Sequence, residues 1–485
     1  MQPNLARPLA FLSSEQLSTL HQAVLTVLWE VGVRVMWEPA LEVFAGGGCR
    51  VDFDSQVVHI SEQVLMRALA SAPASFTLHG VCAENDIHVD LDKVYTIAGS
   101  SAIYVLDLDG QHRPARLADL ADLTRLVDAL EMADIMHAAV VPQEINQVGF
   151  DRILFSTIFQ NTTKHYYSQG QGKGSVSDQV EMAAVIQGST RTVMEKPCFS
   201  LVVCLTSPLV HVPERVQEMM DCARYHIPIW LEATNMMGAT GPVTIAGALV
   251  EQTANVLASL VLMQLLAPGH PCIFSIASGG LNMRTATYVA ASPEAVLLHC
   301  ATAQIAHFYH LPFQGCSGLD SCLPDAQAGY ERMLQAAPLA LAGANFIHLA
   351  FGMMDQLLTS SYEQAVIDNE IFHAAFRLAE GIQVTPETIA LDQIRAAGPG
   401  GQFLDQEYTL MNYRQHQWQP KLTNRLAWDE WQRQTGGKDM RQRANELARQ
   451  ILAEHHPSPL SAAQEAELNQ MARSFQERVI RKTGS

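Results

Sequence analysis

Eight short apolar runs alternate with longer helical patterns between residues 94 and 382. The runs begin at residues 94, 135, 164, 199, 227, 271, 311 and 345 and are rich in β-branched and aromatic residues. Consecutive apolar positions over so short a length are typical of parallel strands that are buried on both faces. Eight strand–helix repeats predict an α/β protein with a (β/α)8 TIM barrel. An open doubly wound sheet is the competing architecture, but we see no G-x-G-x-x-G motif after a strand.

The segments between the runs repeat apolar residues every three or four positions, which predicts helices. These patterns cover residues 117–133, 176–189, 212–226, 292–310, 325–343 and 360–381, together with a long apolar stretch from residue 243. That stretch is the most apolar part of the chain. It contains Glu251, Gln252 and Asn255, which favours a buried helix of a soluble protein over a membrane span.

Two extensions flank the predicted barrel domain at residues 94–382. Residues 1–93 form an N-terminal extension, with a helix expected after the capping signal at Ser13 or Ser14. Short alternating strands are predicted across residues 76–115, with a turn at Asp109-Gly110. Residues 383–485 form a C-terminal extension. It begins as a Gly-rich loop and continues as charged helix, and we expect it to pack on the barrel.

Composition narrows the class of protein. The net charge of −18 argues against a nucleic-acid partner, because phosphate binding needs basic surfaces. The first residues lack a long apolar segment, so secretion is not expected. The nine cysteines show no CxxC pair, which favours reduced thiols and a cytoplasmic location. We expect no membrane partner. Large barrels often pair, which would make a homo-oligomer.

The carboxyl ends of barrel strands are where such folds place their chemistry. Here those ends carry mainly amides and hydroxyls, with few general acids or bases, no Ser–His–Asp order and no lysine. Glu232 and His348 are the exceptions. Glu232 could order a loop or face a cation, and His348 could be a core histidine or a ligand-binding one. His307 and His310 could share zinc on one helix face, but they end a helix, where histidine also suits the dipole. No metal site is therefore predicted.

A polar stretch follows the seventh run, "GLDSCLPDAQAGYERML" at residues 318–334. Asp325 is a good N-cap for the helix that follows. Asp320, Gln327 and Tyr330 are explained less well by helix capping. They would lie in the loop after the seventh strand and in the first turn of its helix, where side chains and helix amides can meet an anionic group of a ligand.

The same region carries a family resemblance. The segments "LPDAQAGYE", "LAGANFIHLAFG", "YEQAVIDNEIF" and "GPGGQFLDQEYT", with residues 20–35, 72–80 and 115–144, resemble the trimethylamine methyltransferase family in the same order along nearly the whole chain. The resemblance implies a barrel that moves a methyl group from an amine to the cobalt of a partner corrinoid protein. It implies no tightly bound cofactor, because the cobalamin belongs to the partner.

Two departures refine what the resemblance implies. Members that act on trimethylamine carry pyrrolysine, whereas this chain has only the twenty standard residues. A histidine of the family is replaced by Tyr408. No role that needs an imidazole is expected at that position. The lack of pyrrolysine makes the chain more similar to members that demethylate quaternary amines such as glycine betaine, proline betaine or carnitine. Glycine betaine, which would leave as dimethylglycine, is the substrate we expect first.

Direct displacement from a quaternary ammonium needs no general acid, because the leaving group is a neutral tertiary amine. The barrel has to hold the cation, orient one N-methyl group and exclude water. Aromatic faces and carboxylates hold cations, and a betaine carboxylate needs amide or imidazole donors. The predicted substrate-binding residues are Tyr104, Glu232, Phe274, Phe313, Gln314, Asp320, Gln327, His348 and Phe351.

Two other functions stay open at this point. One is a betaine-binding or sensor barrel without catalysis. The other is a metal-dependent barrel lyase or hydrolase, which would contain stoichiometric zinc. No catalytic residue can be assigned from the sequence.

Overall fold

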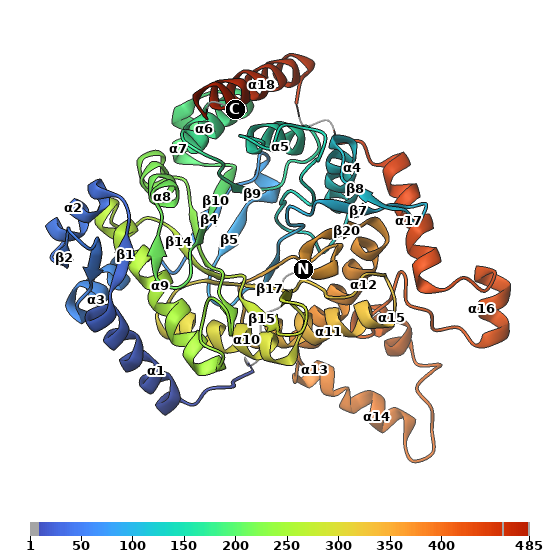
Figure 1. Cartoon of the computed structure of the whole chain (residues 1–485). Helices are drawn as coiled ribbons and strands as arrows, with labels where there is room; N and C mark the ends of the chain where they lie inside the picture. Colours follow the sequence, from blue (N-terminus) through green and yellow to red (C-terminus); the bar gives the residue numbers. More distant parts are fainter. Residues whose placement is uncertain (1–8, 458–459, 484–485) are drawn as a thin grey trace.

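The computed structural model, which describes residues 9–457 and 460–483, contains a closed parallel barrel. Seven strands follow one another in the order β6-β18-β17-β14-β12-β10-β9. Bridges from Ile97 to Ile135 and from Met136 to Tyr166 insert an eighth strand position between β6 and β9 and close the ring. Figure 1 shows the strands at the centre of the molecule with helices around them. The predicted (β/α)8 barrel is confirmed, and each of the eight apolar runs supplies one strand.

The barrel strands are β6 (Tyr95–Thr96), β9 (Tyr166–Gln169), β10 (Phe199–Leu205), β12 (Ile229–Ala233), β14 (Cys272–Ile276), β17 (Phe313–Cys316) and β18 (Phe346–His348). The surrounding helices are α4 (Leu117–Asp128), α5 (Asp151–Phe159), α6 (Ser175–Gln187), α7 (Thr190–Glu195), α8 (Pro213–Tyr225), α9 (Ile245–Leu266), α10 (Pro293–Phe308), α11 (Ala326–Leu341) and α12 (Tyr362–Ala379).

Helices α5 and α9 are informative about burial. The predicted helical patterns omit α5, because it buries the charged residues Asp151 and Arg152, which a sequence pattern marks as exposed.

Helix α9 is long and apolar enough to cross a membrane by length and composition alone, but 78% of its most apolar stretch is buried inside the protein. It packs against α1, α3, α8, α10 and β12. Helix α9 is therefore a buried helix in the ring of helices around the barrel.

In the N-terminal extension the helices pack against α9, and a hairpin covers the amino end of the barrel. These helices are α1 (Ser14–Thr26), α2 (Glu38–Gly46) and α3 (Glu62–Ser71), and Ser13 forms the predicted capping box with Gln16. Strands β1 (Val33–Val35), β2 (Arg50–Asp52) and β3 (Val57–His59) form a sheet with β11 (Val210–His211). The hairpin of β4 (Phe76–Leu78) and β5 (Ile87–Val89) packs its apolar residues against Tyr95, Trp230 and Phe346, which face the barrel interior.

The C-terminal extension lies outside the barrel helices. Helix α17 (Met440–Glu454) packs on α12 and α4, and α18 (Ala462–Thr483) packs on α5 and α6. The segment between carries α13 (Pro386–Ile389), α14 (Leu391–Ala397), α15 (Glu407–His416) and α16 (Trp428–Thr435). Figure 1 shows α14 projecting away from the rest of the protein.

Two small sheets follow the carboxyl ends of the barrel strands. One pairs β7 (Tyr104–Leu106) and β8 (His112–Pro114) with β20 (Thr359–Ser361) and β19 (Met353–Met354). The other joins β13 (Met236–Met237), β15 (Gly279–Asn282) and β16 (Thr287–Val289). The predicted turn at Asp109-Gly110 connects β7 to β8, and Gly110 takes a positive φ of 78° there. Because these strands continue from β6, β12, β14 and β18, they frame the carboxyl end of the barrel.

Candidate active site at the carboxyl end of the barrel

Three polar residues form one row across neighbouring strands near their carboxyl ends. Glu232 on β12 pairs in register with Ser275 on β14, and Ser275 pairs with Gln314 on β17. Residues in register on parallel strands project to the same face, and here that face is the barrel interior. The Ser275 hydroxyl lies 3.3 Å from Glu232 Oε2 and also hydrogen-bonds Gln314 Oε1. The row therefore joins a carboxylate, a hydroxyl and an amide.

Two further side chains hold the Glu232 carboxylate. The Tyr167 hydroxyl, which reaches across from β9, lies 3.2 Å from Glu232 Oε2 and 3.4 Å from Gln314 Oε1. The Cys204 thiol on β10 lies 3.4 Å from the other oxygen, Oε1. Both can donate to a carboxylate, so Glu232 has partners on each oxygen and a defined orientation.

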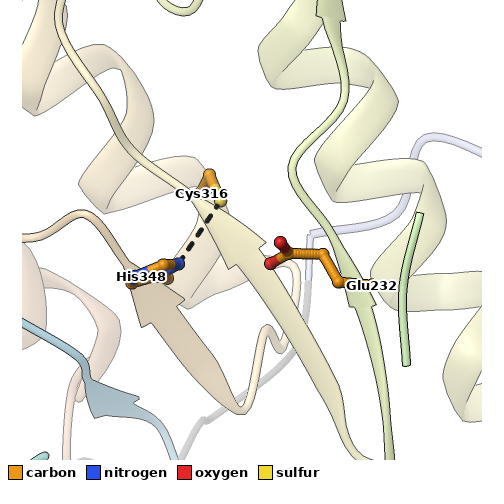
Figure 2. Close-up of side chains that lie close together, drawn as sticks. All are labelled: Glu232, Cys316 and His348. Carbon is orange, nitrogen blue, oxygen red and sulfur yellow. Dashed lines mark hydrogen bonds between the residues drawn. The ribbon is translucent and has the colours of Figure 1, made fainter. Parts of the chain in front are cut away.

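Cys316 and His348 lie beside this row. They are paired in register on β17 and β18, and Cys316 Sγ is 3.9 Å from His348 Nδ1. Figure 2 shows both side chains and the Glu232 carboxylate converging from three strands. One ligand-type atom from each of the three residues lies within 4.8 Å of the other two. The barrel has thus collected a carboxylate, a thiol and an imidazole at one point.

Aromatic rings surround the same cluster. The ring centroid of Tyr167 lies 4.8 Å from His348, 4.9 Å from His137 and 4.9 Å from Trp230. His137 Nδ1 lies 2.6 Å from the Tyr167 carbonyl. Because a carbonyl only accepts, His137 must carry its proton on Nδ1, and its Nε2 is then an acceptor.

Burial keeps this cluster free of positive charge at neutral pH. It lowers the pKa of His137 to about 4. Burial, and then the neighbouring His137, lower the pKa of His348 well below its usual value. Burial also raises the pKa of Glu232, although hydrogen bonds from Cys204, Tyr167 and Ser275 oppose that rise. Since both histidines are neutral, Glu232 is the side chain that can bring charge to the cluster, and that charge is negative.

Cys204 shows that the cluster borders a recess. The side chain of Cys204 is exposed, yet the surrounding protein raises the pKa of its thiol well above the usual value. A side chain that is exposed although protein surrounds it must line a hollow. The Cys204 thiol contacts Glu232, so the carboxylate, with 5% of its surface exposed, lies beside this hollow.

The structure brings together three of the predicted binding residues, namely Glu232, Gln314 and His348. It separates the predicted phenylalanines from them. Phe274 and Phe313 pack against each other, with centroids 6.2 Å apart, in the main core between the barrel and its helices. Their neighbours Ser275 and Gln314 face inward, so alternation sends both rings outward. Phe351 packs on Phe372 of α12. The grouping of these rings with Glu232 is therefore corrected.

Tyr104, Asp320 and Gln327 also lie outside the cluster. Tyr104 is on β7 and packs against His112, with centroids 4.8 Å apart. The Asp320 carboxylate accepts the backbone N–H groups of Ala290 and Ala291, so it orders the loop before α10. Gln327 is exposed on the first turn of α11. The polar stretch at residues 318–334 therefore mainly orders loops and starts a helix, and Asp325 is the N-cap as predicted.

Sequence reasoning missed Tyr167, Cys204, Cys316 and His137. The usable signal is alternation within each strand. Cys316 is two positions after Gln314, and Cys204 is in register with Glu232. Cys316 and Cys204 therefore face the barrel interior, as Gln314 and Glu232 do, and the sequence already indicates Gln314 and Glu232 as strand-end residues.

Several known proteins are similar to this chain along most of its length. Residues 2–478 match the family described as trimethylamine methyltransferase (MTTB). Trimethylamine methyltransferase MttB of Desulfitobacterium hafniense is 35% identical over 454 residues, which cover 93% of this chain and 91% of that protein. Glycine betaine methyltransferase of the same species is 32% identical over 460 residues, covering 94% and 95%. The crystal structure of the monomethylamine methyltransferase of Methanosarcina barkeri aligns over 90% of this chain and 92% of that chain, at 12% identity and a TM-score of 0.47.

Proposed function

The chain belongs to the trimethylamine methyltransferase family, and we propose that it transfers a methyl group from a quaternary amine to the Co(I) of a partner corrinoid protein. Glycine betaine is the first substrate to test, with proline betaine and carnitine next. The curated relatives are methyltransferases, and one of them is named for glycine betaine. The corrinoid is a second substrate carried by another protein.

The observation that carries the proposal is the buried carboxylate of Glu232 beside the recess. The polar side chains there are a carboxylate, an amide, hydroxyls, thiols and neutral imidazoles, as described above. Burial raises the pKa of Glu232, so a cation beside this side chain would stabilise its charged form. The Tyr167 hydroxyl contacts the carboxylate, and the rings of Tyr167, Trp230 and His348 pack together beside it. An anionic substrate would meet no fixed positive charge among these side chains.

The chemistry requires little proton transfer, which suits neutral histidines. The C–N bond breaks with its electron pair left on nitrogen, and the methyl carbon bonds to cobalt through the electron pair of Co(I). The products are a neutral tertiary amine and methyl-Co(III), so atoms and electrons balance without an acid. The recess contributes by orienting one methyl group and excluding water. We further propose that the protein works in a reducing cytoplasm, where its nine free cysteines stay as thiols.

The direct test uses purified protein, reduced corrinoid partner and glycine betaine, and follows the absorbance of methyl-Co(III). We expect turnover by the wild type and a rise of about tenfold or more in KM for Glu232→Gln, which removes the charge facing the cation. Glu251→Gln is the matched control, because Glu251 is also buried but is bonded to Asn235 instead of facing Tyr167. Absence of methyl-Co(III) with every quaternary amine would refute the proposal.

A further inference from the structure

Glu232, Cys316 and His348 are the three kinds of residue that zinc prefers as ligands. They come from three different strands, β12, β17 and β18, and each is buried, with 5%, 6% and 4% of its surface exposed. Among the described residues they are the group of histidine, cysteine and acidic side chains whose donor atoms come close enough to share one ion. Such a convergence of unlike donors is unusual in an apolar barrel core.

The spacing of the donors is that of metal ligands. Zinc bonds sulfur at about 2.3 Å and imidazole nitrogen at about 2.0 Å in tetrahedral sites, which places two such ligands about 3.6 Å apart. Cys316 Sγ and His348 Nδ1 are 3.9 Å apart. The carboxylate completes a triangle whose sides are all within 4.8 Å. Small side-chain rotations therefore suffice to place all three on one ion.

The surroundings hold these donors in place, as outer partners do in metal sites. Tyr167 and Ser275 contact one oxygen of Glu232, and Cys204 contacts the other. The backbone N–H of Cys316 donates to His299 Nδ1 at 3.0 Å. The Nε2 atom of His348 has no hydrogen-bond partner of good geometry among the described residues. A hydrogen bond to the backbone of Gly99 and packing against Tyr167 and His137 hold the imidazole in place.

We propose that Glu232, Cys316 and His348 bind a divalent metal ion of the zinc class. Three protein ligands leave a fourth position open, as in catalytic zinc sites, and the open position adjoins the recess beside Cys204. A thiolate and a carboxylate neutralise the dication, and its open fourth position can accept water or an oxygen or sulfur donor of a bound small molecule. The metal site itself does not rest on the proposed function.

Cobalt(II) is the probe, because a thiolate-bound tetrahedral Co(II) ion has intense absorption bands that the hydrated ion lacks. Metal-free full-length protein is titrated with Co(II) in the absence of amine and corrinoid. We expect saturation at one ion per chain with thiolate-to-cobalt bands, and displacement of those bands by Zn(II). Cys316→Ser and His348→Gln should weaken binding at least tenfold, and Cys316→Ser should remove the charge-transfer band.

Cys198→Ser is the matched control, because its thiol is also buried but lies in the main core before β10, outside the ligand triad. It should keep both the stoichiometry and the charge-transfer band. Circular dichroism establishes which variants are folded, and His348→Gln provides a second ligand variant if Cys316→Ser is not. The proposal is overturned if wild-type protein leaves Co(II) with the spectrum of the hydrated ion, or if Cys198→Ser loses the band as Cys316→Ser does.

This titration separates the two proposals. A thiolate-bound cobalt spectrum without methyl transfer to any corrinoid would support the metal site and count against the proposed function. Methyl transfer by protein that binds no Co(II) would support the proposed function and count against the metal site.

Discussion

The buried pair of Arg332 and Asp368 gives a sharp test of how the site is supported. Both side chains are fully buried, and the guanidinium contacts the two carboxylate oxygens at 2.8 and 3.0 Å. The same guanidinium donates to the backbone carbonyls of Ser317 and Leu349, which directly follow Cys316 and His348. Arg332 therefore ties the ends of β17 and β18 to α12 as well as neutralising Asp368.

The expected magnitude follows from burial. Arg332→Met leaves the Asp368 charge without its cation, and Asp368→Asn leaves the guanidinium without its anion. Breaking one side of a buried pair costs about 3–5 kcal/mol of unfolding free energy. The double variant buries no unpaired charge, so it should be less destabilised than the sum of the single variants by about 1–3 kcal/mol. Arg332→Met should also lower methyl transfer, because the ends of β17 and β18 lose their tie.

Urea denaturation of the four proteins measures this cycle. The exposed pair of Arg395 and Asp392 is the control, since its side chains are 68% and 88% exposed, and Arg395→Met should cost less than about 1 kcal/mol. The reasoning fails if Arg332→Met costs no more than Arg395→Met, or if the effects at Arg332 and Asp368 simply add.

Three further predictions concern other parts of the molecule. Gly279→Ala would place a Cβ atom 2.6 Å from the Tyr288 ring, so it should lower the free energy of unfolding in urea by about 1–3 kcal/mol. Gly280→Ala, whose Cβ would have its nearest atom at 3.6 Å, should be tolerated. Equal losses of stability in the two variants would contradict this reasoning. Burial lowers the pKa of His270 to about 4. The unfolded chain therefore takes up that proton first, and stability present above pH 6.5 is lost as the pH falls toward 4. His270→Gln should spare about 2 kcal/mol of that loss at pH 5, and an unchanged pH profile would count against it. Leu468 of α18 is fully buried, so Leu468→Ala should lower the free energy of unfolding by about 2–5 kcal/mol and show that the C-terminal helix belongs to the folded unit. The prediction is refuted if Leu468→Ala lowers the melting temperature less than a substitution of an exposed residue does.

The predicted helices show where sequence reasoning works and where it stops. Helix α1 has Ser13 and Gln16 at its start and a regular apolar face, so capping and periodicity both point to it. Helix α5 has Asp151 and Arg152 fully buried, and their charge hides its apolar face from a pattern search. Their burial depends on Asp178 of α6, 3.0 Å from the guanidinium, a partner that no local pattern reveals.

The candidate site divides in the same way. Glu232, Gln314 and His348 were reached from the sequence because they follow apolar strands. Cys316 was not, since a cysteine near a strand end looks like any small core residue. The phenylalanines are grouped with Glu232 because the family resemblance implies a cationic substrate, whereas alternation places Phe274 and Phe313 on the other face of the sheet.

Local sequence determined the barrel itself. A strand buried on both faces needs consecutive apolar residues, and each of the eight runs contains them. The meeting of Tyr167 with Glu232, or of Cys316 with His348, was decided only by the tertiary structure. Those pairs are 65 and 32 residues apart, and their contact depends on the register between strands and on closure of the ring. Inward or outward direction changes with a shift of one residue, so a small uncertainty in register is enough to hide the site from the sequence.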